Sequence, residues 1–148
     1  MTDDLINAAR AAAANAHAPY SGFGVGAAVR LENGEIITGC NFENASYGLT
    51  LCAETVALAT VNAQGKLRQV REIAVIGGKL VDGTISGSAS VNPCGRCRQV
   101  INEAAQMSGH DTGIYCVSAD GANVTHHRIS QLLPHPFGPA DQIGRAHV

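Results

Sequence analysis

Cys52-Ala53-Glu54 and Pro93-Cys94-Gly95-Arg96-Cys97 are the two stretches that decide how this chain folds and what it can bind. The first is a Cys-x-Glu, and the second, further along the chain, is a Pro-Cys-x-x-Cys. Three thiolates can hold Zn²⁺ and leave its fourth position open for water. A neighbouring glutamate can move protons to and from that water. The two stretches therefore predict a zinc site with an acid/base group beside it.

The spacing of these residues favours two helix starts at the metal. Cys94 and Cys97 lie about 60° apart on one face of a helix, and Pro93 suits the beginning of that helix. Cys52 and Glu54 would lie roughly 200° apart on a regular helix, so both reach one metal only if Cys52 is at or before the first turn. The partial positive charge of two helix N-termini would then favour thiolates over thiols.

The five cysteines allow other interpretations. An odd number, and an N-terminus without the apolar core of a signal peptide, argue against a disulfide framework. A thioredoxin-like redox Cys-x-x-Cys would leave Cys52-Ala53-Glu54 unexplained. A purely structural zinc site needs a fourth protein ligand, which Cys40 or Cys116 could supply. We expect instead that these two are small buried residues in strands.

Composition bounds the class of protein. The 148 residues are 45% hydrophobic, enough for one core, so we expect a single domain over residues 1–141 and a flexible tail over 142–148. A net charge of −2 without a basic run argues against binding to long nucleic acid. No stretch approaches the roughly 20 apolar residues of a membrane span, so no membrane partner is expected. Without a targeting signal, the cytoplasm is the expected location.

Helical and strand patterns alternate along the chain. Asn33-Gly34 is a strong hairpin signal between the strands predicted on either side of it. The helices are predicted at 3–17, 53–64, 95–107 and 129–133, and the strands at 24–31, 35–41, 70–77 and 113–118. The sequence allows a further short strand near 123–126, and the Gly- and Ser-rich residues 83–90 are expected to be flexible. This order predicts an α/β fold, a three-layer α-β-α sandwich with a mixed five-stranded sheet.

Five motifs in order resemble those of the small, homotetrameric, zinc-dependent cytidine deaminases, and the resemblance covers nearly the whole chain. They are Pro19-Tyr20-Ser21-Gly22-Phe23, Asn41-Phe42-Glu43-Asn44-Ala45-Ser46-Tyr47-Gly48, Cys52-Ala53-Glu54, Pro93-Cys94-Gly95-Arg96-Cys97-Arg98-Gln99 and Leu132-Leu133-Pro134-His135-Pro136-Phe137-Gly138-Pro139. Cys-x-Glu followed by Pro-Cys-x-x-Cys is also the signature of zinc-dependent deaminases as a class.

The resemblance implies a role for each matching residue. One Zn²⁺ per chain would be held by Cys52, Cys94 and Cys97, with Glu54 as the proton shuttle. Substrate would be contacted by Asn41 and Glu43 at the ribose, especially its 3′-hydroxyl, by Phe23 and the backbone of Ala53 at the pyrimidine, and by Tyr47 and Phe137 from neighbouring subunits. The implied assembly is thus a homotetramer with shared active sites. For Phe42 and Tyr115 we expect plain core positions.

Thr55 departs from the resemblance, because the family commonly carries an arginine directly after Cys-Ala-Glu. That arginine would neutralise thiolate charge, and Zn²⁺ with three thiolates has a formal charge of 2 − 3 = −1. We expect Arg96 or Arg98 to compensate by hydrogen-bonding a ligand thiolate, together with the two helix N-termini.

The implied reaction is hydrolytic deamination of cytidine or 2′-deoxycytidine to uridine or 2′-deoxyuridine, as in pyrimidine salvage. One alternative is a deaminase of a related cytosine nucleoside, because blasticidin S deaminase resembles the chain at both cysteine motifs and also lacks the arginine. It lacks the Asn-x-Glu-Asn found here at 41–44, which favours a ribonucleoside substrate. A catalytically silent zinc-binding interaction module is a third interpretation, and it would not need Glu54, Asn41 or Glu43.

Overall fold

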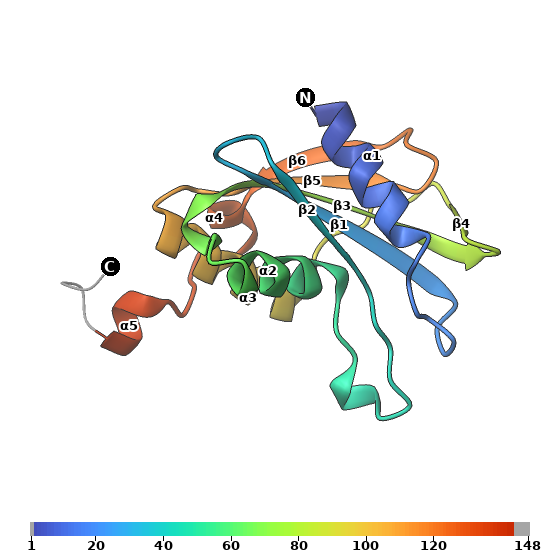
Figure 1. Ribbon diagram of the computed structural model, residues 1–148, viewed down its shortest axis with the longest axis horizontal. Helices are drawn as coiled ribbons and strands as arrows, with labels where there is room; N and C mark the ends of the chain where they lie inside the picture. The colour runs from blue at the N-terminus through green and yellow to red at the C-terminus, as the bar shows by residue number, and fades with distance from the viewer. Residues whose placement is uncertain (1, 144–148) are drawn as a thin grey trace.

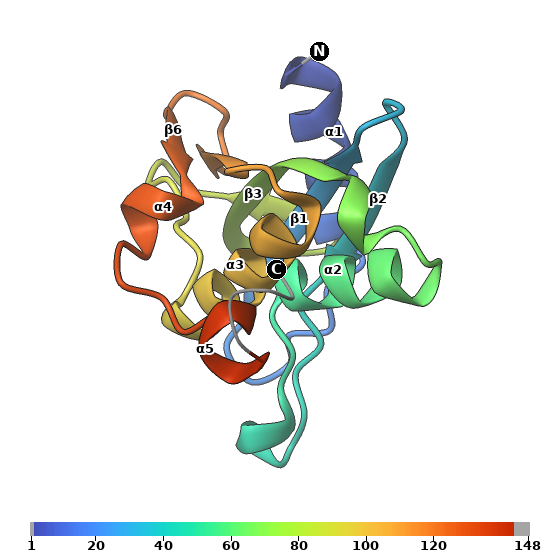
Figure 2. The same cartoon turned by 90° about the vertical axis from the view of Figure 1, so that its left-hand side faces the viewer.

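The computed structural model describes residues 2–143, which form a mixed β-sheet with helices on both faces (Figures 1 and 2). The elements are, in chain order, α1 (Thr2–Ala13), β1 (Phe23–Leu31), β2 (Ile36–Cys40), the 3₁₀ turn η1 (Tyr47–Leu49), α2 (Ala53–Ala63), the 3₁₀ turn η2 (Leu67–Gln69), β3 (Val70–Val81), β4 (Thr84–Ser86), α3 (Gly95–Ser108), β5 (Gly113–Ser118), β6 (Val124–Arg128), α4 (Ile129–Leu132) and α5 (Pro139–Ile143). Of the tail expected at 142–148, residues 144–148 lie outside the described part.

The sheet of the described residues has six strands, one more than the five predicted. Five lie in the order β2-β1-β3-β5-β6, and β4 pairs with the end of β3. β1 is antiparallel to both β2 and β3, whereas β3 and β5 run parallel, so the predicted mixed sheet is confirmed. The extra strand follows Asp82-Gly83, whose φ angles of 51° and 76° suit a tight two-residue hairpin turn. Residues 83–90 were expected to be flexible, but Thr84–Ser86 form a strand paired with β3, so the expectation was wrong for these residues.

Helix α1 covers one face of the sheet. Asp3 and Asp4 lie in its first turn and Arg10 in its last, an arrangement that the helix dipole favours. Its small buried residues bring the helix very close to β1: a Cβ added to Gly26 would lie 1.8 Å from the carbonyl oxygen of Ala9. Only glycine fits at this contact, which fixes how α1 sits on the sheet.

Helices α2 and α3 cover the opposite face, where Figure 2 shows them side by side below the strands. The larger core cluster lies here and joins side chains of both helices to β1, β3 and β5. Helix α2 again approaches a strand through a glycine, because a Cβ on Gly39 would lie 2.5 Å from the amide nitrogen of Ala57. The three-layer arrangement predicted from the sequence is confirmed, and the layer of α2 and α3 carries both cysteine motifs.

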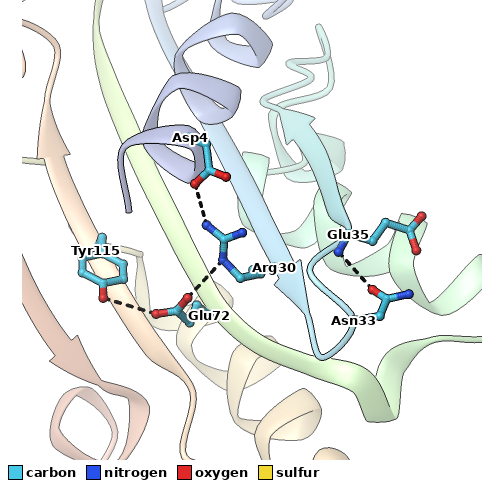
Figure 3. A network of polar contacts seen from close by, with 6 residues as sticks. All are labelled: Asp4, Arg30, Asn33, Glu35, Glu72 and Tyr115. Atoms are coloured by element: carbon cyan, nitrogen blue, oxygen red, sulfur yellow. Dashed lines mark hydrogen bonds and ion pairs between the residues drawn. The ribbon is translucent and has the colours of Figure 1, made fainter. Parts of the chain in front are cut away.

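A polar network on the α1 face ties four elements together (Figure 3). Arg30 of β1 contacts the carboxylate of Asp4 at 2.7 Å and that of Glu72 at 3.2 Å. The hydroxyl of Tyr115 donates to Glu72 at 3.2 Å. Since exposed ion pairs contribute about 0–1 kcal/mol each, this network fixes the register of α1 more than it stabilises the fold. Tyr115 is half-buried and packs against the smaller core cluster, as expected.

The chain between β2 and α2 leaves the sheet as a projecting arm, residues 41–51, seen at the bottom of Figures 1 and 2. The backbones of Phe42 and Leu51 exchange two hydrogen bonds of 2.9 Å at its base. Phe42 is 55% exposed, so the expectation that it is a core residue was wrong. Its side chain meets the edge of the His17 ring, outside both core clusters, because the arm has no second layer to cover it. None of the helices within 2–143 is long and apolar enough to cross a membrane.

Candidate functional site

The three predicted zinc ligands come together at the starts of two helices. Cys52 is the N-cap of α2, Cys94 is the N-cap of α3, and Cys97 lies in the first turn of α3. Their Sγ atoms all lie within 4.8 Å of one another. The Sγ atoms of Cys52 and Cys94 are 3.8 Å apart, which matches the roughly 3.8 Å between two sulfurs on a tetrahedral Zn²⁺ with bonds of about 2.3 Å. The donor set therefore fits zinc.

No fourth protein ligand joins the three cysteines among the described residues. Among the described residues the cluster of metal-binding side chains consists of these three cysteines. Cys116 is buried in β5 and Cys40 is half-buried at the end of β2, and neither joins the cluster. A structural site closed by a fourth cysteine is thus not formed, whereas catalytic zinc sites use three protein ligands and leave one position for water or substrate.

Local electrostatics favour a thiolate at Cys52. The hydrogen bond from the Cys97 thiol lowers the pKa of Cys52 to about 6, outweighing burial, and the charge of Arg96 acts in the same direction. The same hydrogen bond, with burial, raises the pKa of Cys97. The backbone N–H of Cys97 points at the Sγ of Cys94, 3.5 Å away, as expected of a helix start. Of these two sulfurs, Cys52 is therefore the one that ionises more readily.

Thr55 reaches a ligand sulfur, since its hydroxyl oxygen lies 3.4 Å from the Sγ of Cys97. A thiolate on a metal has no proton, so in the loaded site the threonine hydroxyl must be the donor. Arg96 and Arg98 instead donate to backbone carbonyls: Arg96 to Thr50 at 3.4 Å, and Arg98 to Pro93 at 2.8 Å and Leu132 at 3.1 Å. This differs from the expectation that one of the two arginines hydrogen-bonds a thiolate.

Glu54 is buried beside the cysteines, with 3% of its surface exposed. Burial raises the pKa of its carboxyl to about 7, and the neighbouring charge of Cys52 adds to the shift. A cation held by the sulfurs would lower that pKa again. A carboxyl that titrates near neutral pH can both take and give a proton, which is the property a general acid/base needs.

A cavity of about 310 Å³ opens onto Glu54 and the two N-cap cysteines. Seven residues predicted for the site line it: Phe23, Asn41, Glu43, Cys52, Ala53, Glu54 and Cys94. Cys97 is fully buried behind them. Tyr47 lines an adjoining cavity of about 380 Å³ that shares Ser21, Glu43 and Thr50 with the first. Phe137 lines neither of these two cavities and is 59% exposed, on the segment that follows α4.

Asn41 and Glu43 are both held by the loop and strand opposite them. The Oδ1 of Asn41 accepts from the N–H of Val25 at 2.8 Å, and its Nδ2 donates to the carbonyl of Phe23 at 2.9 Å. Glu43 accepts hydrogen bonds from the backbone N–H groups of Tyr20 and Ser21 and from the Ser21 hydroxyl. Burial would raise the pKa of Glu43, but these hydrogen bonds lower it, so the group is a carboxylate at neutral pH.

Sequence reasoning missed several residues that line the cavity. Ser21 lies inside the first quoted motif, and Val91 and Asn92 directly precede Pro93, so position beside a motif was the available signal. Thr50 and Leu51 directly precede Cys52 and carry the same signal, and they reach the cavity because the projecting arm returns to α2 there.

Comparison with known proteins agrees with this geometry. Residues 1–108 match the family described as "Cytidine and deoxycytidylate deaminase zinc-binding region". The chain is 40% identical over 137 residues to a cytidine deaminase of Halalkalibacterium halodurans, covering 93% of this chain and 94% of that protein. A crystal structure of cytidine deaminase from Burkholderia pseudomallei is similar with a TM-score of 0.79 at 36% identity, covering 93% of this chain and 99% of the other. The structure of the Mycobacterium tuberculosis enzyme is similar with a TM-score of 0.70 at 37% identity, covering 93% and 97%.

Proposed function

The chain belongs to the zinc-dependent cytidine deaminase family, and from this premise we propose how its own residues carry the reaction. The activity is hydrolytic deamination of cytidine, with water added and ammonia released at C4 of the base. We extend it to 2′-deoxycytidine. The observation that carries the proposal is Glu54, a buried carboxyl with a pKa of about 7 that faces the same cavity as Cys52 and Cys94.

Cys52, Cys94 and Cys97 would hold the zinc, because their sulfurs all lie within 4.8 Å of one another and those of Cys52 and Cys94 already have the 3.8 Å spacing of tetrahedral coordination. When bound there, Zn²⁺ supplies a Lewis acid that makes water nucleophilic near neutral pH. The two helix N-termini and Thr55 would hold the ligand sulfurs in place. The protein's contribution is thus a fixed, partly buried set of three thiolates with one side open to the cavity.

Glu54 would do the proton transfers. Its carboxylate takes a proton from the attacking water and delivers a proton to N3 of the pyrimidine, which makes C4 more electrophilic. It then takes the proton of the new hydroxyl on C4 and delivers it to the amino group, which leaves as ammonia as the C4–N bond breaks and the C4 carbonyl forms. Burial raises the pKa of Glu54 and a cation on the neighbouring sulfurs would lower it, so the two effects oppose each other and the carboxyl can both take and give a proton.

The remaining cavity residues would position the substrate. We assign the base to Phe23 and the backbone of Ala53, and the sugar to Asn41 and Glu43, since all four line the cavity that contains Glu54. Binding energy from the sugar then holds C4 in place for reaction, so free cytosine should be a poor substrate.

The charges around the cavity favour a nucleoside over a nucleotide, although the matching family covers cytidine and deoxycytidylate deaminases alike. Among the described residues, no lysine, arginine or histidine lines either the active-site cavity or the adjoining one, and the Glu43 carboxylate faces both. A phosphate on the sugar would meet the like charge of Glu43, and no cationic side chain among the described residues of the same chain lines the cavity to offset it. We therefore propose that deoxycytidylate is at best a poor substrate.

The working assembly that we propose is a homotetramer with shared active sites. Tyr47 and Leu49 at the tip of the projecting arm are 74% and 65% exposed, and Phe137 is 59% exposed. Large apolar side chains gathered on a projecting arm are typical of a surface that another chain covers. A second copy would cover Tyr47 and Phe137 and bring them to a neighbour's cavity. A cytoplasmic location suits the three free thiols that the metal needs.

The test is loss of the cytosine absorbance band when the zinc-loaded protein is mixed with cytidine, with ammonia measured in parallel. We expect turnover of cytidine and 2′-deoxycytidine and little of free cytosine or deoxycytidylate. Zinc-loaded protein that leaves all four unchanged would contradict the proposal, and blasticidin S as the next substrate would then separate the alternative deaminase from a silent zinc-binding module.

A further inference from the structure

The Glu43 carboxylate has one acceptor position left for a ligand. A carboxylate offers about four acceptor positions, two on each oxygen. Its Oε1 accepts from the N–H of Tyr20 at 3.0 Å and from that of Ser21 at 3.2 Å. Its Oε2 accepts from the hydroxyl of Ser21. The remaining position is therefore on Oε2, directly beside the Ser21 hydroxyl.

The groups that donate hydrogen bonds to Glu43, on Tyr20 and Ser21, lie in a turn that is itself held in place. The turn that carries them is closed by a hydrogen bond of 2.9 Å from the N–H of Gly22 to the carbonyl of Ala18, and Gly22 has a φ of 69° that favours glycine. The N–H of Leu80 then binds the carbonyl of Gly22 at 2.8 Å, which anchors the turn to β3. Because the turn is held at both ends, the direction of the free Oε2 position is set before any ligand arrives.

The Ser21 oxygen also reaches toward the base side of the cavity. It accepts the N–H of Phe23 at 3.0 Å, and the carbonyl of Phe23 is bound by Asn41 at 2.9 Å. Phe23 is 43% exposed and lines the same cavity as Glu43. One hydroxyl thus connects the carboxylate assigned to the sugar with the backbone of the residue assigned to the base.

We propose that Ser21 is a positioning and specificity residue that aims the free acceptor position of Glu43 at a sugar hydroxyl. This inference rests on the proposed function. The free position can only accept a hydrogen bond, so the ligand group that fills it must be a donor: a hydroxyl fits, whereas an ether oxygen or an ionised phosphate does not. Ser21 lines both the active-site cavity and the adjoining one, so it stands where the sugar would bridge them.

The experiment compares kcat/KM for cytidine and for 3′-deoxycytidine in the wild type, Ser21→Ala, Ser21→Cys and Ser21→Thr. Ser130→Ala is the matched control, because Ser130 is exposed, lines neither of the two cavities, and donates its hydroxyl to the carboxylate of Asp111 at 2.6 Å. We expect Ser21→Ala to reduce the preference for cytidine by about 10-fold, the effect of one weakened hydrogen bond to a charged group. Ser21→Thr keeps the hydroxyl and should restore the preference, and Ser21→Cys should lie between. Zinc content should be the same in all variants.

Three outcomes would overturn the role of Ser21 in an active enzyme. The first is a cytidine preference unchanged in both Ser21→Ala and Ser21→Cys. The second is an equal fall for the two substrates, which would show that Ser21 merely supports the fold around Phe23. The third is a wild type that does not prefer cytidine at all. Failure of the proposed function looks different, because zinc-loaded wild type would then deaminate neither substrate.

Discussion

Removing the hydroxyl of Thr55 should weaken zinc binding without unfolding the protein. Thr55→Val keeps the shape of the side chain and leaves its methyl groups in an apolar groove between α2 and α3, beside Leu58 and Ala104. The change deletes the donor that lies 3.4 Å from the Sγ of Cys97. Cys97 is fully buried, so water cannot easily replace that donor.

The expected magnitude follows from this burial. A hydrogen bond to a charged group contributes about 1.5–3 kcal/mol, and each 1.4 kcal/mol or so is a factor of ten in affinity. Thr55→Val should therefore lower zinc affinity by about 10- to 100-fold. Mutation of a residue that hydrogen-bonds a metal ligand typically lowers metal affinity by this amount. Thr55→Ser keeps the hydroxyl and should stay near the wild type.

The assay is competition for zinc with a chromophoric chelator, with melting of the metal-free proteins as the check on folding. Thr60→Val is the matched control, since Thr60 lies on the same helix and its hydroxyl donates to the carbonyl of Val56 at 2.8 Å. Equal zinc affinity in Thr55→Val and Thr60→Val would show that helix N-termini and backbone groups suffice, and the role given to Thr55 would be wrong.

Three further predictions concern the ligands, the packing and the assembly. Cys94→Ala should lose zinc while Cys116→Ala keeps it, as metal analysis of the purified variants would show; full occupancy in Cys94→Ala contradicts the ligand set. Gly39→Ala places a methyl group against the first turns of α2, so it should lower the free energy of unfolding by about 1–3 kcal/mol and reduce zinc content. The control Gly48→Ala, whose Cβ would lie in open space, should change neither quantity. Equal denaturation midpoints for the two variants would refute this packing argument. Phe137→Ala should lower activity in assembled protein, and light scattering that finds a fully active monomer would contradict the shared site.

The parts of the fold that the sequence predicted are those with strong local signals. Asn33-Gly34 predicted the hairpin of β1 and β2, and the cysteine motifs predicted helix starts near Cys52 and Cys94, both of which the structure confirms. The extension of β3 was missed because Gly77 and Gly78 interrupt its apolar run. Glycine is needed at position 78 of this strand because the backbone of Ser86 lies very close. A Cβ on Gly78 would lie 2.3 Å from the carbonyl oxygen of Ser86.

The parts that were missed depend on contacts between distant segments. Phe42 is a large apolar residue of the kind usually found in a core. It is exposed because it lies on the projecting arm, residues 41–51, which leaves the sheet. Thr55 was expected beside the zinc ligands, but only as the position of a missing arginine; the contact of its hydroxyl oxygen with the Sγ of Cys97, at 3.4 Å, was not predicted. Ser21 gave no chemical signal of its own, since its importance comes from lying between Glu43 and Phe23.

The central claim is that Glu54 moves the protons of a zinc-dependent cytidine deamination. The most direct measurement is the steady-state rate of cytosine absorbance loss for wild type and Glu54→Gln at equal, measured zinc content. Glutamine keeps the size and polarity of the side chain but cannot shuttle a proton, so we expect folded, zinc-loaded Glu54→Gln to be slower by at least about 10²-fold. A zinc-loaded Glu54→Gln that turns over cytidine at the wild-type rate would contradict the account.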